Sequence, residues 1–139
     1  MDSKSIEKAI FEIVEKKKIL SKLDYSDERY DDLEEELHDF EDDFLEKYGT
    51  YLEKALEEVH AKHCPDNDIL LPIAYIANQY EKIGEDPSGA PLYDVSPNQG
   101  VYVDVDKKPG VVSKLVIVPS PLRLVLSSPK SKEIVWKAK

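Results

Sequence analysis

Two histidines and the only cysteine lie close together near the middle of the chain, where they could bind a metal ion. His60 and His63 are three residues apart, and Cys64 follows directly. Imidazole nitrogen and thiolate sulfur are common zinc ligands, and residues three apart on a helix share one face. The cluster therefore raises the hypothesis of a small metal site, or of an enzyme that uses these three residues. The alternative, which we favour, is that they end a helix, where histidine opposes the negative end of the helix dipole.

The glycine pattern argues against the common nucleotide-binding loops. The chain has five glycines and no G-x-G sequence. Gly84 and Gly89 have the spacing of a P-loop, but Ala90 and Pro91 follow where that loop needs Lys and Ser or Thr. The G-x-S-x-G sequence of serine hydrolases is also missing. We therefore expect no cofactor and favour a function that is not enzymatic.

Carboxylates crowd the segment from residue 27 to residue 46, which holds twelve Asp and Glu residues and one arginine. Asp31, Glu35 and Asp39 are four residues apart, so on a helix they share one face and repel each other. This face either only keeps the chain in solution or docks a basic partner. Residues 1–68 carry a net charge of −12 and residues 69–139 one of +2. This distribution argues against nucleic acid as a partner, because phosphate binding requires cations.

Residues 85–100 form a long predicted loop that interrupts the chain between helical and strand patterns. Its backbone is restricted by three prolines, Pro87, Pro91 and Pro97. The loop nevertheless carries Leu92, Tyr93 and Val95, which a fully solvated linker does not need. These side chains either pack beneath the loop or contact a partner. Leu92 and Tyr93 are therefore the second set of candidate partner-binding residues, besides Asp31, Glu35 and Asp39.

Hydrophobic periodicity predicts two long antiparallel helices, a helical hairpin, within residues 1–64. The first helix is expected over residues 3–23. The second apolar stripe runs from Tyr30 to Val59 in steps of three or four residues and predicts a helix over residues 27–62. Gly49 and the capping pattern after it allow a break there. We favour a continuous helix, because the stripe keeps its phase across Gly49.

The second half of the chain predicts a short third helix over residues 69–83 and then an antiparallel sheet. Alternating or apolar strand patterns occupy residues 101–105, 111–118, 122–126 and 134–136, with a turn at residues 107–110. Short connections favour a meander of three or four strands. The expected fold is therefore α+β, with an acidic helical region (1–64) and a region of short helix, loop and sheet (65–139) that together form one domain.

Length and composition limit the classes of function that remain. A chain of 139 residues suits one domain, and its apolar runs are far shorter than the ~20 residues that a membrane-spanning helix needs. A single cysteine and the lack of a signal peptide predict a cytoplasmic protein that does not enter a membrane. We expect a protein-binding protein, an adaptor or an immunity-type inhibitor, that binds a basic protein or itself. A homodimer is predicted, because the stripe from Tyr30 to Val59 is longer than the first helix can cover.

Overall fold

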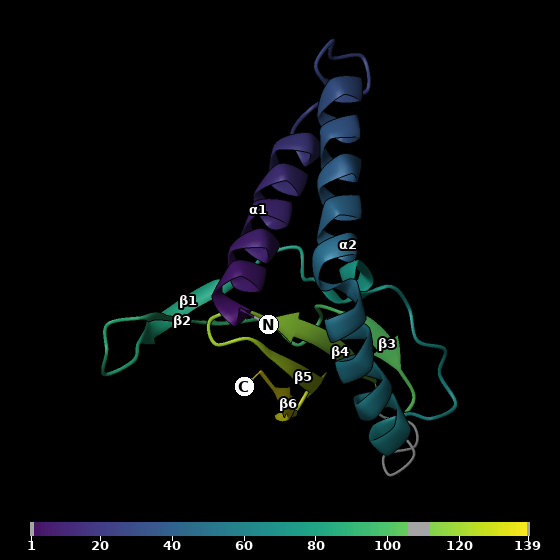
Figure 1. Cartoon of the computed structure of the whole chain (residues 1–139), viewed down its shortest axis with the longest axis vertical. Helices are drawn as coiled ribbons and strands as arrows, with labels where there is room; N and C mark the ends of the chain where they lie inside the picture. The colour runs from purple at the N-terminus through teal and green to yellow at the C-terminus, as the bar shows by residue number, and fades with distance from the viewer. Residues whose placement is uncertain (1, 106–111, 139) are drawn as a thin grey trace.

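Two long helices occupy the first half of the computed structural model, which describes residues 2–105 and 112–138. Helix α1 spans Ser3–Ser21 and helix α2 spans Tyr30–His63. Figure 1 shows them side by side, joined by residues 22–29 at the end that lies farthest from the strands. Strands follow in the second half, so the expected α+β class and the long N-terminal helices are confirmed.

The first helix begins at a side-chain cap and buries one face. The carboxylate of Asp2 accepts a hydrogen bond from the Lys4 backbone N–H at 3.0 Å, which satisfies one of the unpaired donors of the first turn. The buried face follows the expected helical spacing and consists of Ile6, Ile10, Ile13 and Val14.

The second helix is continuous through Gly49, as favoured from its apolar stripe. The helix begins at Tyr30 and not at the predicted residue 27. Asp27 instead lies in a preceding turn, where its carboxylate accepts hydrogen bonds from the backbone N–H and the guanidinium of Arg29. Phe44 and Leu52, on either side of Gly49, are buried. Burial of this apolar face on both sides outweighs the low helix propensity of one glycine, which costs about 1 kcal/mol relative to alanine.

Replacing Gly49 by alanine is expected to stabilise the protein by about 0.5–1 kcal/mol, because alanine restricts the unfolded chain and favours the helix. A Cβ at this position would lie 3.8 Å from the Cβ of Leu45, an ordinary contact that requires no repacking. Urea unfolding of both proteins measures the change. A lower midpoint for the alanine variant would show that the helix is strained at this point.

The predicted third helix over residues 69–83 is wrong. Only Pro72–Tyr75 is helical, as a single 3₁₀ turn called η1. The chain then leaves the helical path, because Ile76 pairs with Ile117 in an isolated parallel β-bridge. The Tyr80 hydroxyl holds the next residues extended by accepting from the Ala77 N–H at 3.0 Å and donating to the Ile117 carbonyl at 2.6 Å. Tertiary contacts thus override a spacing that resembles a helix.

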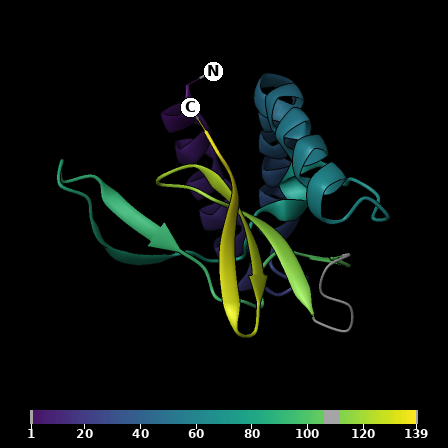
Figure 2. The ribbon, with the colours of Figure 1, turned by 90° about the horizontal axis from the view of Figure 1, so that it is seen from below.

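A two-stranded antiparallel sheet replaces the end of the predicted third helix and part of the predicted long loop. Strand β1 spans Glu81–Glu85 and strand β2 spans Pro91–Asp94. The carboxylate of Asp86 organises the turn between them by accepting from the Ser88 and Ala90 backbone N–H groups at 2.8 and 3.0 Å. Figure 2 shows the β1–β2 pair projecting from the rest of the molecule.

The predicted meander is confirmed as a separate four-stranded antiparallel sheet with the order β3-β4-β5-β6. Its strands are β3 Val101–Val103, β4 Ser113–Val118, β5 Arg123–Ser128 and β6 Ser131–Lys137. Strand β5 is buried along its whole length and β4 almost so, as expected for the two central strands. The turn predicted at residues 107–110 lies outside the described residues.

The main core joins both helices to the four-stranded sheet. Leu52, Leu56 and Val59, from the second half of α2, are buried in one cluster with residues of β4 and β5 that include Leu115 and Leu124. The stripe that extends beyond α1 is therefore covered by the sheet of the same chain, which removes the reason given for a homodimer. The homodimer itself stays a prediction. Within the described residues, no helix is both long and apolar enough to cross a membrane.

Candidate functional site

His60 is buried on the last turn of α2, and hydrogen bonds engage both of its ring nitrogens. Nδ1 lies 3.2 Å from the carbonyl oxygen of Asn67, and Nε2 lies 2.9 Å from the hydroxyl of Tyr75. A carbonyl only accepts, so Nδ1 donates to Asn67, and in the tautomer with its hydrogen on Nδ1 the Nε2 atom accepts from Tyr75. A tyrosine hydroxyl is protonated at neutral pH, and burial raises the pKa of Tyr75 further. The same hydroxyl accepts from the Leu70 N–H at 3.1 Å.

In this structure both ring nitrogens of His60 thus face protein partners. His63 is half-exposed at the end of α2, and Cys64 is buried at its C-cap, where its N–H donates to the His60 carbonyl. Across residues 2–105 and 112–138, no group of three or more His, Cys, Asp or Glu side chains is arranged to hold a metal ion. The metal hypothesis for His60, His63 and Cys64 therefore receives no support from the geometry.

The acidic candidates lie on the exposed surface of α2. Asp31, Glu35 and Asp39 are all exposed. Two neighbouring carboxylates form ion pairs: Glu36 pairs with Lys16 of α1 at 2.6 Å, and Asp43 pairs with Lys47 at 3.0 Å. Among the residues that the structure describes, no basic group lies within ion-pairing distance of the three candidates.

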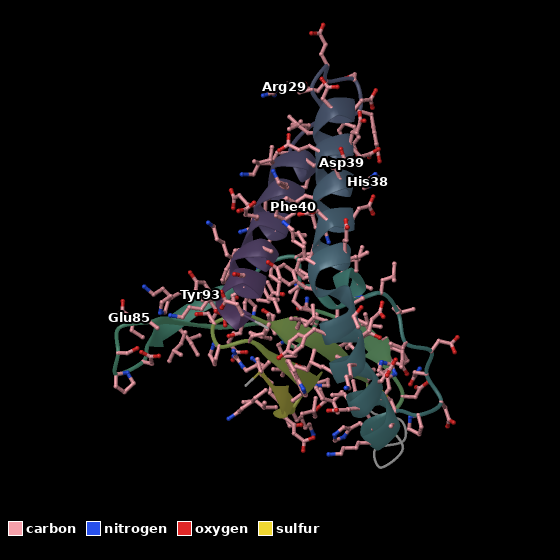
Figure 3. All side chains as sticks on the ribbon, viewed as in Figure 1. Arg29, His38, Asp39, Phe40, Glu85 and Tyr93 are labelled. Atoms are coloured by element: carbon pink, nitrogen blue, oxygen red, sulfur yellow. The ribbon has the colours of Figure 1, made fainter. Side chains whose placement is uncertain are left out.

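Orientation separates the acidic face of α2 from its packing face. Figure 3 shows Phe40 on the side of α2 that faces α1 and His38 on the side away from it. The ammonium group of Lys16 lies 5.5 Å from the centroid of the Phe40 ring. Lys16, which pairs with Glu36, is thus on the packing side of α2.

Leu92 and Tyr93 lie on β2, and both are half-buried. Figure 3 shows Tyr93 away from Asp39 of the acidic row. The Tyr93 ring packs on Phe11 of α1 with centroids 4.7 Å apart. Its backbone N–H donates to the Ser120 carbonyl at 3.0 Å. Tyr93 therefore fastens the β1–β2 pair to α1 and to the β4–β5 connection.

Sequence reasoning missed Arg123, which is buried at the start of β5. Its guanidinium donates to the carbonyls of Tyr93 at 2.6 Å and Pro121 at 2.7 Å. Burial lowers the pKa of Arg123, while the charges of Asp94 and Glu7 act in the opposite direction. The only available signal in the sequence is a single arginine within the apolar run of residues 122–126. Arg123 holds the β1–β2 pair in place.

A groove of about 680 Å³ lies between α1 and the start of β2, with Lys8, Phe11, Glu12 and Pro91 among its lining residues. Ser120 also lines it, but its hydroxyl donates to the Pro91 carbonyl. The histidines, which could serve as a base for a nucleophile, are all on α2 and do not line the groove.

A second hollow, of about 290 Å³, lies where the connection between α2 and η1 runs beside α2 (Figure 1). It is lined by Glu53, Glu57 and three consecutive aliphatic residues, Ile69, Leu70 and Leu71. We call these five residues the apolar–acidic patch. The sequence pattern did not indicate it, because residues 69–71 fall within the predicted third helix. Comparison of this chain with known protein families, curated proteins and solved structures finds no match.

Proposed function

We propose that this chain is a non-enzymatic protein-binding module that docks the basic surface of another protein through the outer face of α2. The observation that carries the proposal is the exposed row of Asp31, Glu35 and Asp39, which has no cation beside it in the described structure. Repulsion along such a row opposes helix formation, and a basic partner would relieve it.

The arrangement of the helices supports this use of α2. The end of α2 that carries the acidic row stands with α1 away from the four-stranded sheet, so a partner can approach it without obstruction by the strands (Figure 1). Surfaces of one charge sign steer oppositely charged partners and raise association rates. An adaptor or an immunity-type inhibitor that covers a basic site fits this form of recognition. We place it in the cytoplasm, where a lone cysteine stays reduced.

A homodimer remains the other mode of association that we propose for the chain. Its contact would not be the apolar stripe of α2, which the sheet covers. Exposed apolar side chains on edge strands are the alternative, and Ile134 on β6 and Ile83 on β1 are of this kind.

Reversing the acidic row, by Asp31→Lys, Glu35→Lys and Asp39→Lys together, is expected to slow association with a basic protein surface about tenfold at low salt. The probe is an immobilised poly-lysine peptide of about 20 residues, and association rates are measured by surface plasmon resonance at about 50 and 300 mM salt. The difference should shrink at the higher concentration, where the Debye length falls to ~6 Å.

The matched control reverses Glu15, Glu81 and Glu133, three exposed carboxylates on other elements. It changes the net charge by the same amount, so it isolates the position of the charges from their number. Equal association rates for the two triple variants would show that the acidic row serves only solubility and would refute the proposal.

A further inference from the structure

We infer that the apolar–acidic patch is the docking surface for a partner segment that presents an aliphatic side chain flanked by lysine or arginine. This inference rests on the proposed function and assigns it a second, chemically distinct contact. Three observations carry it: the exposure of the aliphatic residues, the rigid support behind them, and the carboxylates at their border.

The aliphatic part of the patch is exposed without interruption. Ile69, Leu70 and Leu71 keep 42%, 45% and 55% of their surface in contact with solvent. A single exposed leucine is ordinary, but three consecutive large aliphatic residues on the surface are unfavourable unless they serve a contact. The hollow beside them provides room for an inserted side chain.

The segment is held in this exposed position from behind. The Leu70 N–H donates to the Tyr75 hydroxyl, which is itself bonded to buried His60. His60 also holds the Asn67 carbonyl, and the Asn67 side chain accepts from the Asp104 N–H at 2.8 Å. The backbone around Leu70 is therefore tied to α2 and to the chain after β3. A surface prepared in this way loses little conformational entropy on binding.

Negative charge at the border of the patch favours a partner segment with positive charge. Glu53 and Glu57 lie one helical turn apart on α2 and line the same hollow. Neither belongs to an ion pair within the described residues. Asp66 and Asp68 are exposed in the connection that leads to Ile69. An apolar centre with a negative border complements an apolar anchor with a positive border.

The test uses the full chain labelled with ¹⁵N and a synthetic helical peptide in which leucines occupy one face and lysines the remainder. Amide shift changes centred on residues 53–57 and 69–71 are expected. The double variant Leu70→Ser, Leu71→Ser should weaken peptide binding by about tenfold or more. The control Ile19→Ser removes an aliphatic residue of similar exposure (45%) from α1 and should leave the affinity unchanged. Thermal unfolding confirms that both variants are folded.

The peptide with glutamate in place of every lysine should bind at least about tenfold more weakly, because its charges face Glu53 and Glu57. Equal binding of the two peptides would refute the charge selection and with it the inference. Shift changes confined to residues 31–39, unaffected by the double variant, would refute the patch while leaving the proposed function in place. No binding of the lysine peptide at any surface would refute both. Self-association in light scattering that the double variant abolishes would show that a second copy occupies the patch.

Discussion

Gly100→Ala is expected to destabilise the protein by about 3–5 kcal/mol, because it combines backbone strain with a steric clash. Gly100 has a φ of +107°, a conformation that side chains with a Cβ rarely adopt. The new Cβ would lie 2.5 Å from the Leu115 carbonyl oxygen and 2.8 Å from the Cβ of Val116. Both belong to β4, the central strand beside β3, so the clash separates strands instead of moving a flexible side chain.

Gly89→Ala is the matched control for this prediction. Gly89 also has a positive φ, +89°, but nothing lies within 4 Å of a Cβ built there. Only the backbone strain applies, and the expected loss is about 1–2 kcal/mol. Chemical denaturation of both variants gives the difference. Equal losses would mean that β3 and β4 are not as closely paired around Gly100 as the structure shows.

Leu56→Ala is expected to cost about 2–5 kcal/mol of unfolding free energy, because it leaves a cavity between α2 and the sheet. Leu56 is 0% exposed in the main core. The same change at Leu71, which is 55% exposed, should alter stability by less than about 0.5 kcal/mol. Circular dichroism during urea unfolding measures both. A loss at Leu71 comparable to that at Leu56 would place Leu71 in a core and remove the basis of the docking surface.

The helices and the meander could be predicted because their patterns extend over many residues. The apolar stripe of α2 keeps its phase from Leu37 to Val59, and the predicted strands after Gly100 show alternating or apolar runs. The prediction of a helix over residues 69–83 was wrong, because a few apolar residues at helical spacing are also compatible with other backbone conformations. There the hydroxyl of Tyr80, bonded to Ile117 far along the chain, determines the path.

The roles of the candidate site residues were harder to predict than the helices and strands, because these roles depend on contacts with residues that are distant in sequence. The spacing of His60 and His63 suggests a metal, but Tyr75, fifteen residues from His60, occupies one ring nitrogen. Arg123 has its acceptors on Tyr93 and Pro121, and no local pattern indicates that it is buried. The exposure of the acidic residues was easier to foresee, because a carboxylate needs no partner to remain in water.

An uninterrupted α2 also sets a fixed spacing between the two proposed contacts. Eighteen residues separate Asp39 from Glu57, which corresponds to about 27 Å along a straight helix. A bivalent partner must match this span, with about eight residues of extended chain or a helix as long as the interval. A shorter linker between its two basic segments would permit only one contact at a time. The partner would then lose the increase in affinity that two simultaneous contacts provide. The length of α2 would then select partners whose two basic segments are separated by a matching distance.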